Sequence, residues 1–239
     1  ELRSRFVSIA SHQFRTPLSV IKSNVEFLDE IYSHAIRADR VQRYQNIQKR
    51  IDSEIDRLTH LMDDILIMGK LNAGKVKPDF EIVDLYRSLS NVLEEEFHHE
   101  QIQHRLNIEV EGELFPVQLD VRLFEHIVGN LLTNAIKFSV DSKPPQIKIV
   151  YLKDWVEVLV IDHGIGIPLE DLPHLFDSFY RGSNSEEIPG TGLGLSIVKE
   201  FVQINGGKIH VESELGKGST FILSFPLVKT QNYAGNIGK

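Results

Sequence analysis

The stretch Ser8-Ile9-Ala10-Ser11-His12-Gln13-Phe14-Arg15-Thr16-Pro17-Leu18 is the most informative part of the 239-residue chain. From this stretch onward, apolar residues recur at alternating spacings of four and three: Phe14, Leu18, Ile21, Val25 and Leu28. This spacing predicts a helix that packs against other helices. At about 100° per residue, His12 falls on the side of the helix opposite Ile21 and Leu28. An imidazole on the solvent face of a helix is a nucleophile, a ligand or a residue without a role.

The surrounding sequence predicts a helical hairpin over residues 1–70. Residues 1–33 form one expected helix, bent by Pro17, which removes a backbone hydrogen bond. After a turn at 33–40, a second helix is expected from about 41 to 68. Its apolar stripe consists of Tyr44, Ile51, Ile55, Leu58, Met62 and Ile65. Because two hairpins together bury more apolar surface than one, we expect a homodimer built as a four-helix bundle.

The pattern changes after the hairpin. A linker is predicted at 71–77, inside a segment that carries two glycines and a proline. Residues 78–228 then mix strand and helix patterns without regular alternation, and residues 229–239 form a C-terminal tail. Strands are expected at 106–110, 146–152, 155–161, 208–212 and 219–225, and helices at 84–104, 121–138 and 193–205. This order predicts an α+β domain with a mixed sheet covered by helices on one face.

Composition narrows the class of protein. The net charge of −8 argues against nucleic acid as a partner. No apolar run reaches the roughly 18 residues of a membrane span, and the absence of cysteine excludes disulfides and thiolate zinc sites. We expect this fragment to be cytoplasmic, and membrane attachment of the full-length parent stays open. The chain starts in helical register without Met, which suggests a fragment whose upstream sensor domain is missing.

Three motifs in the second domain point to a nucleotide. On the expected helix 121–138, His126, Asn130, Asn134 and Lys137 share one face, and amide oxygens and lysine suit Mg²⁺ and phosphate. Such a stripe by itself is also typical of a solvated helix face. Asp162 follows a strand, and the glycines after it let a flat ring approach the backbone. A glycine turn capped by aspartate has the same pattern.

The third motif is the glycine-rich loop 190–195, which leads into a helix and suits an anion. It is not a Walker loop, and it does not follow a strand as a dinucleotide-binding loop must. Arg181 stands at the start of the polar segment before it, where a guanidinium could reach a terminal phosphate or simply be solvated. Gly216 to Gly218 predict a hairpin turn, with Thr220 near the ligand.

In this order and spacing, the motifs resemble the catalytic core of a sensor histidine kinase of a two-component system, over nearly all of residues 1–228. The resemblance implies a dimeric phosphotransfer hairpin and a Bergerat-type ATP-binding domain, a fold shared with gyrase-like ATPases. It also implies ATP and Mg²⁺, autophosphorylation of the hairpin, and transfer to an aspartate of a response regulator receiver domain. Phosphatase action on that regulator is implied as well.

The resemblance also assigns residues. It makes His12 the phosphoacceptor, with Thr16 orienting water in the phosphatase reaction. Asn130 and Asn134 hold the metal, Lys137 and Arg181 contact phosphates, and residues 182–189 form the ATP lid. The remaining ligand contacts come from the Asp162 loop, the lid, the glycine loop and the last strand: Asp162, Gly164, Gly166, Ile167, Gly182, Gly190, Thr191, Gly192, Leu193, Gly194, Leu195 and Thr220.

Gln13 departs from the family pattern, which has Glu or Asp after the histidine. An amide can orient the imidazole but cannot take its proton, so slow autophosphorylation is one expectation and an adequate amide is the other. Gln13 also supports a second interpretation, a nucleotide-binding pseudokinase or a phosphatase-biased signalling dimer. A third is an ATPase without phosphohistidine, similar to topoisomerase or mismatch-repair enzymes, against which the exposed His12 argues.

Overall fold

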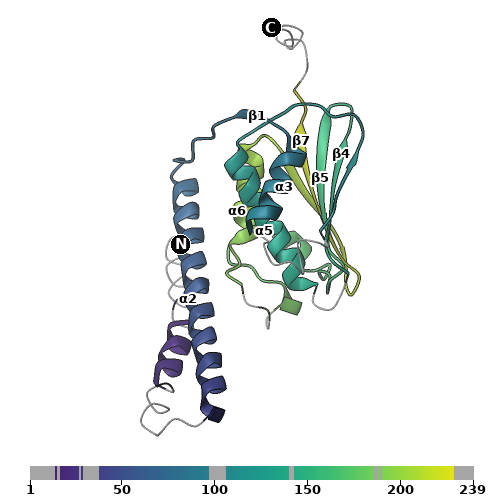
Figure 1. Cartoon of the computed structure of the whole chain (residues 1–239). Helices are drawn as coiled ribbons and strands as arrows, with labels where there is room; N and C mark the ends of the chain where they lie inside the picture. Colours follow the sequence, from purple (N-terminus) through teal and green to yellow (C-terminus); the bar gives the residue numbers. More distant parts are fainter. Residues whose placement is uncertain are drawn as a thin grey trace. The chain divides into compact units, whose positions relative to one another are not determined.

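The computed structural model describes residues 14, 17–26, 28, 38–96, 106–139, 143–185, 188 and 190–228. The chain divides into two compact units, Glu1–Ala73 and Gly74–Lys239, and each is described by itself. The first unit is a pair of helices, and the second is a layer of helices on a sheet (Figure 1). The predicted fold class, a helical hairpin followed by an α+β domain, is confirmed.

In the first unit, two helices lie side by side. Residues 17–26 are helical, and α2 runs from Ala38 to Asn72. Side chains from both helices line one hollow: Ser19, Val20, Ser23, Asn24, Asn46, Ile47 and Arg50. Asn24 is buried, and its amide donates to the backbone carbonyl of Val20 at 2.8 Å. This bond lies within the first helix, and polar side chains from both helices line the hollow between them.

The hairpin leaves an apolar face uncovered. On α2, Ile47, Leu61 and Met68 form a buried seam. About 100° around the helix lies an exposed apolar stripe, which consists of Ile55, Met62 and Leu66 at 48%, 54% and 59% exposure. In the predicted stripe of the first helix, Leu18 and Val25 are likewise exposed. Two helices cannot enclose both faces.

The helix α2 extends beyond its predicted span of 41–68. Ala38–Arg40 are already helical, which shortens the expected turn at 33–40. Gly69 lies inside the helix, because a glycine there costs only about 1 kcal/mol and packing outweighs it. Gly74, with φ of +62°, follows the helix end. The helix therefore runs two residues into the segment predicted as the linker, 71–77.

The second unit is built on a five-stranded sheet with the order β2-β4-β5-β7-β6. Its strands are β2 (Ile108–Glu111), β4 (Gln146–Tyr151), β5 (Trp155–Ile161), β6 (Lys208–Glu214) and β7 (Gly218–Pro226). β2 and β4 are parallel and the other neighbours antiparallel, so the sheet is mixed, as predicted. In β5, Val156, Val158 and Val160 are buried in alternation, which makes one face of the sheet the core.

Three helices cover this face (Figure 1). They are α3 (Leu85–Glu96), α5 (Val121–Phe138) and α6 (Gly194–Ile204). The predicted span of α5 is confirmed, and α6 is one residue shorter at each end than predicted. The expected extension of α3 to residue 104 falls on 97–105, outside the described residues. Phe124 of α5 meets Phe225 of β7 edge to face, with ring centroids 5.9 Å apart.

Four short elements were not predicted. β1 (Glu81–Val83) pairs with β3 (Val117–Leu119) in a two-stranded sheet. Two 3₁₀ turns, η1 (Leu172–His174) and η2 (Ser183–Ser185), lie between β5 and α6. Elements of three residues are too short to show a sequence period. Within the described parts of the chain, no helix combines the length and the apolar character needed to cross a membrane.

Candidate nucleotide-binding site

The asparagine pair lies on α5, and the start of this helix is set by a cap. The side chain of Asp120 accepts a hydrogen bond from the backbone N–H of Leu123. Farther along, the Asn134 amide donates to Asn130 Oδ1 at 3.1 Å, so the two side chains orient each other. This bond uses an N–H of Asn134, and the amide oxygen remains an acceptor suited to a metal ion.

The loop that follows β5 is locked onto the end of α5. The N–H of Ile165 donates to the carbonyl of Phe138 at 3.2 Å, and a side chain at Gly164 would place Cβ 2.1 Å from the same oxygen. Gly166 has φ of +66° and packs against the backbone of Glu214. No other residue fits both glycine positions without moving the backbone. The Asp162 loop is therefore attached to the helix that carries the asparagines.

Asp162 is held deep in this loop. It is 7% exposed, and its Oδ1 accepts from the N–H of Gly164 at 2.8 Å. Gly218, predicted only as part of a turn, packs on the Asp162 backbone, because a Cβ there would lie 2.1 Å from its carbonyl oxygen. Burial raises the pKa of Asp162, although hydrogen bonds from Gly164 and Ser219 partly oppose the rise. A buried carboxylate with acceptor capacity left suits an exocyclic amine.

The glycine-rich loop closes the other side. A Cβ at Gly194 would lie 2.5 Å from Asn130 Nδ2, and one at Gly190 would lie 3.1 Å from Lys137 Nζ. The loop is thus in direct contact with the polar face of α5. The absence of side chains at Gly190 and Gly194 is what allows this close approach.

Two other predicted residues of the glycine-rich loop have side chains that are buried or half-buried. Leu193 is fully buried, and its N–H donates to the hydroxyl of Thr191 at 3.2 Å, so only its backbone can face a ligand. Leu195 is half-buried on the first turn of α6.

In the Asp162 loop, the N–H of Ile167 donates to Ser213 Oγ at 2.8 Å. Thr220 is half-buried on β7 and is the register partner of Ile161, next to Asp162. His126, which the spacing grouped with the asparagines, packs instead edge to face on Phe201, with centroids 5.2 Å apart.

Arg181 points to the lid rather than to an open space. Its Nη2 donates to the backbone carbonyls of Ser185 and Ile188, at 2.6 Å each. The predicted contact with the terminal phosphate therefore requires a change of partners. Gly182, next to it, lies against Asp171, with a built Cβ 3.2 Å from Asp171 Oδ2.

Sequence reasoning missed the anchor of this segment. Asp171 is 4% exposed and accepts hydrogen bonds from Tyr180 and Ser183, which stand nine and twelve residues later. These partners meet only because irregular turns fold the segment back, so no spacing rule could have found them. The predicted hairpin residues His12, Gln13 and Thr16 lie outside the described residues.

Comparison with known proteins agrees with this geometry. Residues 2–74 match the family described as His Kinase A (phospho-acceptor) domain. Residues 119–229 match the family described as histidine kinase-, DNA gyrase B-, and HSP90-like ATPase. The chain is 32% identical to sensor histidine kinase MtrB of Mycobacterium tuberculosis over 231 residues, covering 95% of the chain and 40% of MtrB. It is 31% identical to signal transduction histidine-protein kinase ArlS of Staphylococcus epidermidis over 228 residues, covering 94% of the chain and 48% of ArlS.

Solved structures show the same fold. The histidine kinase AdeS of Acinetobacter baumannii superposes with a TM-score of 0.68 at 23% identity, covering 91% of this chain and 98% of that one. Histidine kinase ThkA, solved in complex with response regulator TrrA, gives 0.69 at 21% identity, with 95% and 63% covered.

The fold and site define an ATPase domain of the histidine kinase and gyrase type, preceded by a phospho-acceptor hairpin. The chain belongs to the sensor histidine kinases and forms their catalytic core. It spans less than half the length of the curated relatives MtrB and ArlS.

Proposed function

We propose that this chain is an ATP-dependent protein-histidine kinase that phosphorylates its own His12. The observation that carries the proposal is the direct contact of the Asp162 loop and the glycine-rich loop with α5. Gly164 packs on the end of α5, Gly194 packs on Asn130, and Gly190 packs beside Lys137. These close approaches place the Asp162 loop and the glycine-rich loop directly against the helix that carries the asparagines, so the groups suited to a nucleotide lie next to one another.

The residues suggest roles in this reaction. Asp162 accepts a hydrogen bond from the adenine amine, which selects adenine over guanine. Lys137 and Arg181 offset charge on the phosphate oxygens as the terminal phosphoryl group is transferred. A neutral ring nitrogen of His12 attacks the phosphorus in line, the nitrogen–phosphorus bond forms, and the bond to the ADP oxygen breaks.

Mg²⁺ fits the donors that the site offers. Asn134, oriented by its bond to Asn130, supplies a hard oxygen, and Mg²⁺ is usually held by one or two protein oxygens with phosphates and water. When bound, the ion neutralises charge on the phosphates. Asn130 then acts as a second ligand or as the group that orients the first.

The proposed partners follow from the hairpin. A second copy of the chain covers the exposed stripe of α2 and completes a four-helix bundle. The phosphoryl group passes from His12 to an aspartate of a response regulator receiver domain, and Thr16 supports hydrolysis of that phospho-aspartate. We place the reaction in the cytoplasm, downstream of a sensor domain. Gln13 supports one alternative, a pseudokinase or phosphatase-biased dimer that binds ATP without forming phosphohistidine.

The deciding experiment is incubation with ATP labelled on the terminal phosphate, in the presence of Mg²⁺, for wild type and His12→Ala. We expect a label that is lost in acid, survives base, and is absent from the variant. An unlabelled wild-type chain that still binds ATP would contradict the kinase and favour the alternative. Full ATP turnover by His12→Ala would instead indicate an ATPase without phosphohistidine.

A further inference from the structure

Asp171 makes the most concentrated set of polar contacts near the lid. Its carboxylate accepts from Tyr180 OH at 2.6 Å, from the Ser183 N–H at 2.9 Å and from Ser183 Oγ at 3.0 Å. Asp171 itself is 4% exposed, whereas its partner Tyr180 is half-buried and its partner Ser183 is exposed. Hydrogen bonds to a buried carboxylate are among the strong ones in proteins. The lid root, residues 179–185, is therefore fastened at two points to one side chain.

The lid root is also attached to the glycine-rich loop and to the Asp162 loop. On the phosphate side, the N–H of Phe179 donates to the carbonyl of Gly192 at 2.7 Å. Phe179 has φ of +65°, a conformation that a bulky residue keeps only when its surroundings impose it. On the adenine side, the Asn184 amide donates to the carbonyl of Gly166 at 2.9 Å. The backbone of the lid root thus has a determined place in the site.

Arg181 stands between the two fastened residues. Tyr180 precedes it, Ser183 follows two positions later, and both bind Asp171. Its guanidinium donates to the carbonyls of Ser185 and Ile188. The backbone is held on both sides of Arg181. The guanidinium can therefore change its hydrogen-bond partners by rotation about the side-chain bonds of Arg181, without movement of the backbone. A terminal phosphate is charged and a carbonyl is neutral, so the phosphate is the stronger acceptor.

We propose that Asp171 is a positioning residue for Arg181, and that the pair makes the site prefer ATP over ADP. The carboxylate holds the lid root where the guanidinium can exchange the lid carbonyls for a terminal phosphate. ADP lacks that phosphate and leaves Arg181 on the lid. This inference rests on the proposed function, because it takes ATP as the phosphoryl donor.

A purely structural role for Asp171 makes a different prediction. If the carboxylate only stabilised the domain, its loss would weaken ATP and ADP binding alike. A role through Arg181 changes the ratio of the two affinities and leaves ADP binding nearly constant. The ratio is therefore the quantity to measure.

The test is calorimetric titration of the full chain with Mg²⁺ and either ADP or an ATP analogue with a non-hydrolysable terminal bond. Asp171→Asn places an amide N–H against donors, and Tyr180→Phe removes one bond to the carboxylate. We expect the preference for the ATP analogue to fall about tenfold in Asp171→Asn and less in Tyr180→Phe. Binding of ADP should stay within about twofold of wild type, since no bond to the terminal phosphate is at stake.

A matched control is Asp177→Asn, which makes the same change on the same segment. The Asp177 side chain is 63% exposed and forms its hydrogen bond with His174 rather than with Tyr180 or Ser183, so the preference should not change. In an Arg181→Ala background, Asp171→Asn should cause no further loss of preference, because the two residues act through one contact.

Equal weakening of both nucleotides, or additive losses in the double variant, would overturn the inference. So would a wild type without a preference for ATP. If Asp171→Asn does not fold, an unchanged preference in Tyr180→Phe and Ser183→Ala would also overturn it. A chain that forms no phosphohistidine but shows the expected ratios would contradict only the proposed function. Normal labelling with insensitive ratios would contradict only this inference.

Discussion

At the scale of single residues, Gly194 links two motifs by lacking a side chain. A Cβ at this position would lie 2.5 Å from Asn130 Nδ2, so Gly194→Ala should displace the amide that orients Asn134. We expect affinity for Mg²⁺–ATP to fall about tenfold or more, measured by calorimetry. Gly69→Ala is the control, because nothing lies within 4 Å of its added methyl group. Equal affinities in the two variants would contradict the contact.

Asp162 predicts how nucleotide binding depends on pH. Burial raises its pKa, so the carboxylate takes up a proton at a higher pH than an ordinary aspartate. Since only the ionised form accepts fully from the adenine amine, acidification through that raised pKa should weaken ATP binding by about tenfold. Asp162→Asn should lack this component. The phosphates of ATP titrate equally with both proteins. The difference between the two profiles of Kd against pH therefore reports the contribution of Asp162 alone. Parallel profiles would contradict this role of Asp162.

Gln13 concerns the rate of phosphorylation. A carboxylate at this position takes the proton from the imidazole, and general-base help is typically worth ~10²–10⁴-fold. We expect Gln13→Glu to raise the initial rate of His12 phosphorylation at saturating ATP by at least about tenfold. An unchanged or lower rate would mean that the amide of the natural residue is sufficient.

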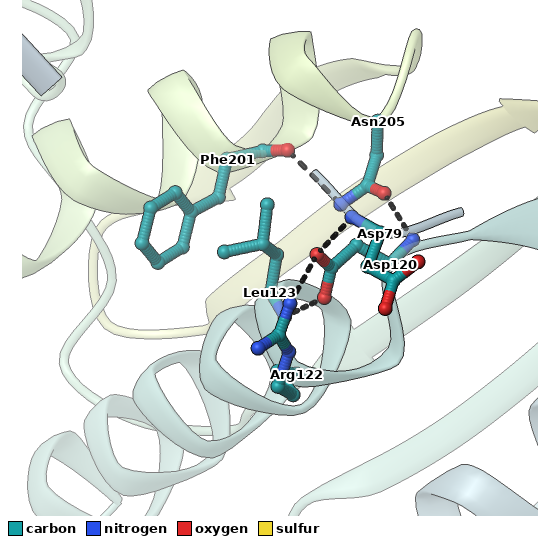
Figure 2. Close-up of polar contacts among 6 residues, drawn as sticks. All are labelled: Asp79, Asp120, Arg122, Leu123, Phe201 and Asn205. Carbon is teal, nitrogen blue, oxygen red and sulfur yellow. Dashed lines mark hydrogen bonds and ion pairs between the residues drawn. The ribbon is translucent and has the colours of Figure 1, made fainter. Parts of the chain in front are cut away.

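At the scale of elements, Asp120 ties three segments together (Figure 2). Its carboxylate caps α5 at Leu123 and accepts from the Asp79 N–H at 2.8 Å, and its own N–H donates to Asn205 Oδ1, also at 2.8 Å. Asn205 follows α6 and donates to the carbonyl of Phe201. The Asp120 side chain thus links the start of the second unit, at Asp79, to α5, which carries the asparagines. The Asp120 backbone is bonded to Asn205, which follows α6.

Asp120→Ala should destabilise the ATPase unit by about 2 kcal/mol, through loss of the helix cap and of the acceptor for Asp79. Unfolding in denaturant can be followed by fluorescence of Trp155, the single tryptophan, which lies on β5. Asp79→Ala is the control, since Asp79 contributes only its backbone N–H to this contact. An equal loss of stability in Asp79→Ala would mean that the effect comes from the removal of a surface charge and not from the cap.

The effect of Asp120 should also depend on pH. Burial alone would raise its pKa, but hydrogen bonds from Asp79, Arg122 and Leu123 outweigh burial and lower the pKa. A lowered pKa in the folded state means that the stabilisation is present above the unfolded value of about 3.9 and is lost as the pH falls through the folded value. The difference between wild type and Asp120→Ala should therefore shrink in acid.

At the scale of the whole molecule, the exposed stripe of α2 predicts association of two chains. Met62 and Leu66 are 54% and 59% exposed. Replacing both with Glu places charges where a second hairpin would bury apolar surface, so the double variant should be monomeric in light scattering. Ser53→Glu adds a charge at an exposed position on the opposite side of α2 and should stay dimeric. A monomeric wild type, or a dimeric double variant, would contradict the predicted bundle.

Several parts of this protein could be read from sequence because they depend on neighbours along the chain. The span of α5 follows from its apolar period and its cap at Asp120, and β5 follows from alternation between Trp155 and Ile161. The pair Asn130 and Asn134 is one helical turn apart, so its shared face is a property of spacing alone. The end of α2 was misjudged because Gly69 resembles a stop signal, and packing carried the helix past it.

Other features required the folded chain, because they join residues far apart in sequence. Gly194 reaches Asn130 only when α6 packs beside α5, and Gly218 reaches Asp162 only when β7 pairs with β5. Asp171 finds Tyr180 and Ser183 through irregular turns whose geometry has no sequence period. The spacing of residues along the chain therefore identifies groups that can bind a nucleotide. Packing of the helices, sheet and loops brings these groups to one place. Burial of apolar surface is what makes such contacts between distant residues favourable.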